Sequence, residues 1–226
     1  MTSISDETYV DVLRKARAIS PRFGRVLERI GPIEIGRSPH RTVAAHLYRT
    51  VVDQQLSLSA ARAIWLRIEA LAKTEGNDVE SLFVDSNFGQ LRSAGISGRK
   101  ARSLIAIREA TLAGGIDEAA LAGMGHLERS AVLCSIWGVG QWTADMIGIF
   151  YFRDPDIWPN GDVSATTTLQ ALSGSGDSAQ TALSFSPYRS ILARYMWRFR
   201  DENRVENTIA RARGKPGRRS KRVHAR

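Results

Sequence analysis

Residues 133–144 read Leu-Cys-Ser-Ile-Trp-Gly-Val-Gly-Gln-Trp-Thr-Ala, and this stretch is the most informative part of the chain. At its centre, two glycines flank one aliphatic residue in Gly138-Val139-Gly140. Apolar residues recur at helical spacing on both sides, over 126–137 and 141–152. Because glycine permits very short turns, the pattern predicts a helical hairpin over about residues 126–152. Val139 should pin the turn onto the core.

The start of the second hairpin helix is a candidate anion site. Backbone N–H groups at Gly140 and Gln141 have no acceptor within the helix, and the helix dipole places partial positive charge there. A nucleic-acid phosphate could accept from these groups, in a contact that positions a duplex without reading its bases. Taken alone, Gly-Val-Gly is more often a plain structural turn between helices, by roughly three to one.

Helical periodicity also dominates outside the hairpin, and strand-like alternation is scarce. Apolar faces and end signals predict further helices over the ranges 6–20, 21–30, 41–53, 57–71, 99–113, 163–172 and 187–207. We therefore expect an all-α protein of about ten helices.

Positive charge is concentrated at the end of the chain. The formal net charge at pH 7 is +9, and residues 209–226 contain eight basic and no acidic residues, which leaves about +1 for the rest. Gly214, Pro216 and Gly217 interrupt helical continuity there. We expect residues 209–226 to be a mobile basic tail, which either binds polyanions or only aids solubility.

Composition argues against several kinds of site. The single cysteine, Cys134, cannot form an internal disulfide or a four-cysteine iron–sulfur or zinc site. The four histidines lack the spacing of metal ligands. No apolar stretch approaches a membrane span, and the first ten residues lack the features of a signal peptide. We expect a cytoplasmic protein, associated with the nucleoid if it is bacterial.

A second informative segment is Trp158-Pro-Asn-Gly-Asp-Val-Ser164, a turn followed by a predicted helix from Val163. Asp162 falls at or next to the N-cap, where helix N–H groups stabilise a charged carboxylate. The residue is either an ordinary capping aspartate or a carboxylate held ready for chemistry.

Together these segments resemble the helix-hairpin-helix DNA glycosylase superfamily, and most closely the DNA-3-methyladenine glycosylase II group. The hairpin glycines, Thr143-Ala144 and Asp162 stand in that group's order, with Asp162 placed 24 positions after Gly138. Further blocks that look like this group are Val51–Ser57 with Gln-Gln-x-Ser, Gly95–Ala101 with Gly-x-Ser-x-x-Lys, and Ser186–Arg198. The blocks span roughly residues 20 to 200 in the right order.

The resemblance implies two helical subdomains over residues 1–208, with the hairpin at the cleft between them. It implies a monofunctional glycosylase that flips alkylated bases such as 3-methyladenine or 7-methylguanine out of DNA and hydrolyses the N-glycosidic bond, in base excision repair. Asp162 would be the catalytic carboxylate that stabilises an oxocarbenium-like transition state. The implied partner is double-stranded DNA with a damaged base, bound by a monomer.

The resemblance also assigns roles to other residues. DNA-binding residues would be Gly138, Val139, Gly140, Gln141 and Thr143 in the hairpin, with Gln54, Gln55 and Leu56 filling the gap left by the flipped nucleotide. The base pocket would be formed by Trp142, Met146 and Phe185. A structural Na⁺ or K⁺ would be held by the backbone carbonyls of Cys134, Ile136 and Val139, and no organic cofactor or iron–sulfur cluster is implied.

Other residues are expected to be structural or solvated. Trp65, Trp137 and Trp197 lie on apolar helical faces, which indicates a core role. Asp145 should be structural, and Asp154 and Asp156 should be solvated turn charges.

One position separates this chain from the lyase branch of the superfamily. Members of that branch carry a nucleophilic lysine two residues after the second hairpin glycine, where this chain has Trp142. No lysine lies between Lys100 and Lys215. Strand cleavage through a Schiff base is therefore not expected.

Three other functions remain open from the sequence. The chain could excise a different lesion, such as a deaminated, etheno or mismatched base. It could be a non-catalytic hairpin protein that binds bent or branched DNA, although Asp162 argues against that. It could also bind RNA through residues 209–226 alone.

Overall fold

The computed structural model describes residues 2–36 and 38–213, which form twelve α-helices and one two-stranded antiparallel sheet. The first elements are β1 (Thr2–Ser3), α1 (Asp6–Ile19), α2 (Pro21–Ile30) and β2 (Glu34–Ile35). The central elements are α3 (Val43–Asp53), α4 (Leu58–Thr74), the 3₁₀ turns η1 (Glu80–Leu82) and η2 (Asp85–Asn87), α5 (Phe88–Ser93), α6 (Gly98–Leu112), α7 (Glu118–Gly123), α8 (His126–Cys134), α9 (Gln141–Ile147) and η3 (Gly148–Phe152), which is π-helical. The last elements are α10 (Val163–Ser173), α11 (Ser178–Leu183) and α12 (Arg189–Arg213).

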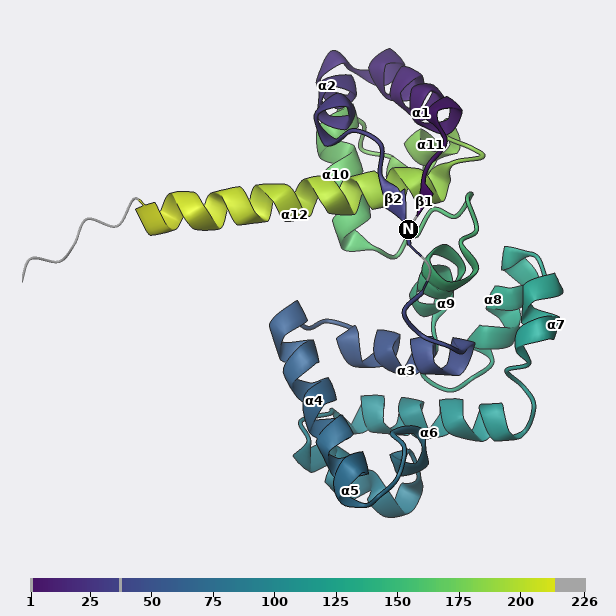
Figure 1. The fold of residues 1–226 in the computed structure, drawn as a ribbon. Coiled ribbons are helices and arrows are strands. Elements are labelled where there is room, and N and C mark those ends of the chain that lie inside the picture. Colours follow the sequence, from purple (N-terminus) through teal and green to yellow (C-terminus); the bar gives the residue numbers. More distant parts are fainter. Residues whose placement is uncertain (1, 37, 214–226) are drawn as a thin grey trace, which may run out of the picture.

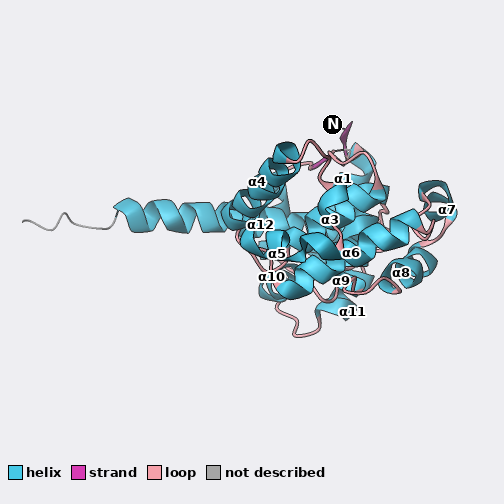
Figure 2. Ribbon diagram, turned by 90° about the horizontal axis from the view of Figure 1, so that it is seen from below, coloured by secondary structure: helices cyan, strands magenta, loops and turns pink. Residues whose placement is uncertain are grey.

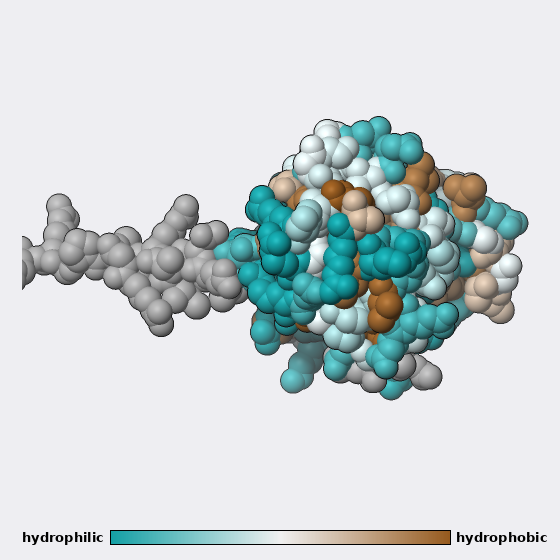
Figure 3. All heavy atoms as spheres, turned by 90° about the horizontal axis from the view of Figure 1, so that it is seen from above, coloured by the Kyte–Doolittle hydropathy of each residue, from teal (hydrophilic) through white to brown (hydrophobic). Residues whose placement is uncertain are grey.

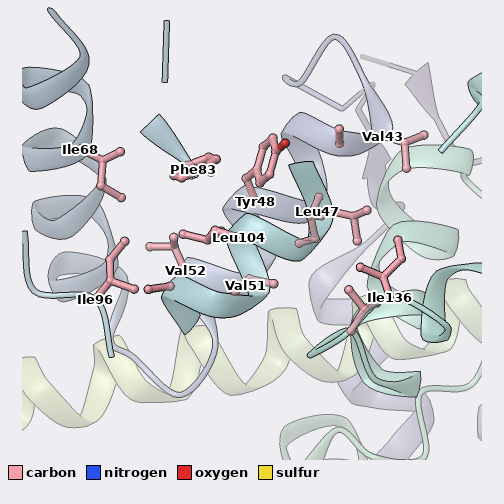
Figure 4. Packing of buried hydrophobic residues seen from close by; sticks show 14 of the residues in the cluster. Val43, Leu47, Tyr48, Val51, Val52, Ile68, Phe83, Ile96, Leu104 and Ile136 are labelled. Carbon is pink, nitrogen blue, oxygen red and sulfur yellow. The ribbon is translucent and has the colours of Figure 1, made fainter. Parts of the chain in front are cut away.

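Buried side chains form two large clusters, which define two helical subdomains as expected. The first core is built within residues 43–152, and Figure 4 shows Tyr48, Val51 and Val52 of α3 at its centre. The second core combines residues from α1 and α2 with residues from α10, α11 and α12. In Figure 1 these five helices gather above, and α3 to α6 lie below. The second subdomain is therefore assembled from both ends of the chain.

The helix starts follow from local capping. Ser57, Ser97 and Asp162 are the N-caps of α4, α6 and α10, and each side chain accepts a hydrogen bond from the backbone N–H three residues later. The three six-residue helices α5, α7 and α11 have no counterpart among the expected ranges. They are too short to show a periodic apolar face.

The hairpin helices end earlier than their apolar patterns predict. The helix α8 stops at Cys134, because residues 135–138 form a turn that ends with the left-handed Gly138. The helix α9 stops at Ile147 and widens into η3, which ends at the left-handed residue Arg153. A π-helical turn keeps the chain helical while changing which side chains face the core.

The last helix reaches further than expected. It continues to Arg213, so residues 209–213 of the expected basic tail are helical. The rest of the expected basic tail, 214–226, lies outside the described residues. Figures 1 and 2 show α12 extending away from the other helices.

The surface seen from above in Figure 3 is mainly hydrophilic, with separate apolar patches, as is usual for a face in contact with water. No helix in the described part of the chain is long and apolar enough to cross a membrane.

Candidate active site

The turn of the hairpin depends on Gly138. Its φ is +81°, a conformation that side chains rarely adopt, and a Cβ there would overlap Ser103 of α6. Val139 is 5% exposed within the first core, and its N–H donates to the Ile136 carbonyl at 3.0 Å. The expectation that Val139 pins the turn is confirmed.

Gly140, in the same turn, is needed for access to the start of α9 and not for its backbone conformation. It is the N-cap of α9 with φ −105°, so its backbone does not require glycine, and a Cβ there would meet no atom within 4 Å. It lines the cleft described below, and no side chain caps α9. The absence of a side chain leaves the helix start open to a ligand that approaches from the cleft.

A cleft of about 660 Å³ lies where four segments meet. These segments are the α3–α4 connection, the start of α6, the hairpin and the start of α10. The lining residues are Gln54, Gln55, Ser97, Arg99, Lys100, Ser103, Gly138, Gly140, Trp142, Thr143, Gly161, Asp162, Val163 and Ser164. The cleft thus brings Asp162 together with both hairpin glycines and with the Gln54–Gln55 pair, although these residues are far apart in sequence.

Asp162 is held by three N–H donors from three helices. Its Oδ1 accepts from the Ala165 backbone N–H at 2.7 Å and from Trp197 Nε1 at 3.0 Å. Its Oδ2 accepts from Trp142 Nε1 at 2.9 Å. Because α9, α10 and α12 all contribute, the orientation of this carboxylate depends on the packing of both subdomains.

The aromatic residues at the site differ from those the sequence predicts. Trp197 packs partly buried against the second core, as expected, but its indole also donates to Asp162 and stacks on Phe150 with a centroid distance of 5.4 Å. Sequence reasoning missed this residue, although the Ser186–Arg198 block contains it. The contact spans 35 residues, so no local pattern reveals it.

The predictions for Phe185 and Met146 do not hold. Phe185 is 0% exposed and packs against Phe23 in the second core, with centroids 5.8 Å apart. It follows α11 and is enclosed by the second core, so its ring is not open to a base in this structure. Met146 is 6% exposed, packs with Ile149 and Ile157, and does not line the cleft. Of the three predicted pocket residues, Trp142 lines the cleft.

Trp65 and Trp137, which were also expected in the core, differ in their burial. Trp137 is 50% exposed, so the core assignment was wrong: α8 ends before it, and the residue lies in the turn. Trp65 packs partly buried against the first core as expected, and its Nε1 donates to Glu69 at 2.7 Å.

The α3–α4 connection forms one side of the cleft. Gln54 Nε2 donates to Thr143 Oγ1 at 2.9 Å, which links this connection to α9. Gln55 has φ +55°, and Leu56 is 39% exposed. Thr143, predicted to contact DNA, is only 1% exposed, so its role in the free protein is to anchor Gln54.

Acidic residues around the hairpin are paired. Asp145 is buried, and its Oδ1 accepts from Gln141 Nε2 at 2.7 Å and lies 3.0 Å from His126 Nε2, which fits a structural role. Asp154 pairs with Arg129 at 2.5 Å and Asp156 with Arg189 at 2.7 Å. The expectation that these two carboxylates are solvated turn charges was therefore wrong.

A second hollow, of about 670 Å³, lies beside Trp197. Phe150 and Arg194 also line it, and the Arg194 guanidinium carbon lies 4.5 Å from the Phe150 ring centroid. Arg194 Nη2 donates to the Ile149 carbonyl at 2.8 Å, and burial lowers the pKa of Arg194 to about 10. Trp197 thus borders this hollow and also donates to Asp162.

The described residues contain no cluster of three or more His, Cys, Asp or Glu side chains that could hold a metal ion. The carbonyls of Cys134, Ile136 and Val139 belong to the end of α8 and the hairpin turn. That of Ile136 accepts one hydrogen bond, from Val139 N–H. A carbonyl oxygen has a second lone pair, so this bond leaves room for a cation ligand.

Comparison with known proteins agrees with the geometry. No model of a known protein family matches the chain. DNA-3-methyladenine glycosylase 1 of Schizosaccharomyces pombe is 32% identical over 167 residues, which are 70% of this chain and 72% of that protein. The solved structure of S. pombe 3-methyladenine DNA glycosylase (Mag1) in complex with abasic DNA matches with a TM-score of 0.73 and 25% identity, over 84% of this chain and 95% of that one. DNA-3-methyladenine glycosidase from Bacillus halodurans matches with a TM-score of 0.70 and 29% identity, over 88% and 92% of the two chains.

Proposed function

Since the chain belongs to the family of DNA-3-methyladenine glycosylases, we propose that it removes alkylated bases from DNA by hydrolysis of the N-glycosidic bond. The single observation that carries the proposal is the placement of Asp162. Three N–H donors orient this carboxylate in a cleft that it shares with the hairpin glycines and the Gln54–Gln55 pair.

The reaction makes positive charge on the sugar. The bond between C1′ and the base nitrogen breaks, and its electron pair leaves with the base. A water oxygen then bonds to C1′ and releases a proton. Asp162 stabilises the oxocarbenium-like transition state and orients the water, a role that a carboxylate held in a fixed position performs without reorganisation.

The leaving group explains why one carboxylate is enough. A base alkylated at a ring nitrogen is often cationic, so it departs as a neutral molecule without a general acid. Trp142 and Trp197 offer electron-rich rings beside Asp162, and a cationic base stacked on such a ring gains roughly 0.5–2 kcal/mol per contact. These two indoles form the proposed base-recognition surface.

Substrate DNA is double-stranded, with the damaged nucleotide rotated out of the stack. The open start of α9 at Gly140 and Gln141 binds a backbone phosphate, and Gln55 and Leu56 fill the gap in the duplex. The backbone carbonyls of Cys134, Ile136 and Val139 would hold a Na⁺ or K⁺ ion, which would supply local positive charge near the hairpin and take no part in the chemistry. The protein acts as a monomer. With Trp142 at the position of the lyase lysine, the product is an intact strand with an abasic site.

The test is release of free base from methylated duplex DNA by the wild type and by Asp162→Asn. Asparagine keeps the N-cap, so the fold should be retained while turnover is lost and DNA binding persists. Asp117→Asn is the matched control, because Asp117 caps α7 by accepting from Ala120 N–H at the same 2.7 Å.

Two results would contradict the proposal. If the wild type frees etheno or deaminated bases and no methylated base, the lesion class is wrong. If Asp162→Asn binds DNA normally and the wild type frees no base of any kind, the chain is a DNA-binding protein without this activity.

A further inference from the structure

Lys100 makes contacts that the proposed chemistry does not use. It lies on the first turn of α6, partly buried, and its Nζ donates to the Val52 carbonyl at 2.8 Å and the Gln54 carbonyl at 2.6 Å. These are carbonyls at the C-terminal end of α3, where helix oxygens lack partners within their own helix. Burial lowers the pKa of Lys100, and the attraction of Asp53 offsets only part of this effect. The ammonium group of Lys100, which belongs to α6, thus caps the C-terminal end of α3.

The segment that Lys100 holds has few other attachments. Gln54 is tied to Thr143, whereas Gln55 and Leu56 are exposed, and Gln55 has left-handed backbone geometry. The Leu56 N–H donates weakly to the Asp53 carbonyl at 3.3 Å. The conformation of this connection therefore depends on Lys100 and Thr143 more than on packing of its own.

A smaller hollow lies along the same connection. It has a volume of about 210 Å³, and its lining includes Gln54, Gln55, Leu56 and Lys100. Because Gln54, Gln55 and Lys100 line both this hollow and the main cleft, the connection is a thin wall with space on two sides. A force applied to Gln55 and Leu56 from the cleft would push them into the smaller hollow unless the backbone behind them is held.

We propose that Lys100 is the positioning residue that braces the connection over residues 54–56, so that Gln55 and Leu56 can be inserted into the base stack of DNA. This inference rests on the proposed function, because insertion matters only for a protein that flips nucleotides. Lys100 does not touch the reacting atoms. It acts through the Val52 and Gln54 carbonyls, which fix where the exposed Leu56 side chain meets the duplex.

The direct test measures insertion without chemistry. A duplex carries an abasic analogue that cannot be hydrolysed, with 2-aminopurine in the opposite strand at that position, so that insertion changes its fluorescence. At saturating protein, the wild type should change the fluorescence, and Lys100→Met should lose most of that change. Lys100→Arg, which keeps several N–H donors, should recover it, and Lys73→Met, an exposed lysine on α4, should match the wild type. Equal amplitudes for Lys100→Met and the wild type would overturn the proposal, as would no change with the wild type.

A second measurement separates bracing from general damage. Single-turnover excision of 7-methylguanine from duplex DNA is measured for Lys100→Met, Leu56→Ala and the double variant. Each single change should slow excision roughly ten- to hundredfold, as expected when a positioning contact is lost. The double variant should be no slower than the slower single variant, because both changes act on one step. If the rate reduction in the double variant equals the product of the two single reductions, the proposal is overturned.

Failure of the proposed function gives a different pattern. In that pattern the wild type releases no alkylated base and still changes the 2-aminopurine fluorescence, with that change lost in Lys100→Met. This result would refute the proposed substrate class and would still support the bracing role of Lys100. If Lys100→Met folds poorly, Lys100→Gln, with one amide donor group, should give an intermediate fluorescence amplitude. A wild-type amplitude for that variant would count against the role of Lys100.

Discussion

The indole N–H of Trp197 donates to Oδ1 of Asp162 at 3.0 Å and so joins α12 to the start of α10. The same oxygen accepts the N-cap hydrogen bond from Ala165, and the other oxygen accepts from Trp142. The carboxylate is therefore positioned by side chains as well as by its own helix.

Trp197→Phe should slow excision while preserving the fold. Phenylalanine retains a ring to stack on Phe150 but loses the N–H, and a hydrogen bond to a charged group contributes about 1.5–3 kcal/mol. We expect single-turnover excision of 7-methylguanine to fall roughly ten- to hundredfold. Trp65→Phe is the control, because it removes a similar indole hydrogen bond, to Glu69, outside the cleft. Equal rates for the two variants would show that the contact with Asp162 has no effect on the reaction.

Substitution of the two hairpin glycines by alanine should affect stability and DNA binding differently. Gly138→Ala forces a positive φ on alanine and creates an overlap with Ser103, so we expect a loss of about 2–4 kcal/mol in the free energy of unfolding. Gly140→Ala meets no atom, and its cost is the poorer N-cap that alanine provides, so we expect a loss of about 1 kcal/mol or less together with weaker DNA binding. Urea denaturation and binding to abasic duplex check both variants. Similar stability losses in the two proteins would contradict this division.

Stability should decrease in mild acid because of His46. Burial, reinforced by the nearby His40, lowers the pKa of His46 from 6.5 to about 4. Between these values the unfolded chain binds a proton that the folded protein does not, so stability is lost as the pH falls through this window and is unaffected above it. The loss from pH 7 to pH 4.5 should be roughly 2 kcal/mol.

The measurement is urea unfolding at both pH values for the wild type and for His46→Gln. Glutamine has no charged form, so the variant should lose less stability in acid than the wild type. Parallel pH dependence in the two proteins would assign the acid sensitivity to other groups.

Arg194 should disfavour cationic bases. Its guanidinium lies over Phe150 in the hollow that Trp197 borders, where it repels a second positive charge. Arg194→Met should therefore raise the excision of cationic 7-methylguanine relative to neutral ethenoadenine by roughly fivefold, which corresponds to about 1 kcal/mol of repulsion between two positive charges. Arg198→Met is the control, because Arg198 lines the same hollow but pairs with Glu202 at 2.8 Å. An unchanged ratio in Arg194→Met would mean that the base does not approach this hollow.

Removal of residues 214–226 should weaken binding without abolishing turnover. The segment carries six basic residues, whose contacts with phosphates would make binding dependent on salt. We expect a shallower salt dependence of the dissociation constant and an unchanged single-turnover rate at saturating enzyme. Loss of excision at saturation would instead indicate that these residues take part in the reaction.

The sequence predicts best what a few adjacent residues determine. Gly138, Val139 and the N-cap position of Asp162 follow from local turn and capping rules, and the structure places them as expected. Trp137 was misplaced because its apolar pattern continues past the real end of α8. Trp197, Phe185 and Lys100 depend on contacts between distant segments. Apolar periodicity and capping rules do not predict that Trp197 of α12 faces Asp162. They also do not predict that Phe185, after α11, faces the second core.

The composition of the second core has a consequence for synthesis on the ribosome. Residues 43–152 contain the whole first core, so this part of the chain can fold while later residues are still being added. The helices α1 and α2 are made before the first core but pack against α10, α11 and α12, which are made after it. The helices α1 and α2 therefore lack these packing partners until α10, α11 and α12 have been made, and Asp162 lacks its Trp197 partner until residue 197 has been added. A chain released before Trp197 would contain the hairpin and the carboxylate, yet not the arrangement that orients them.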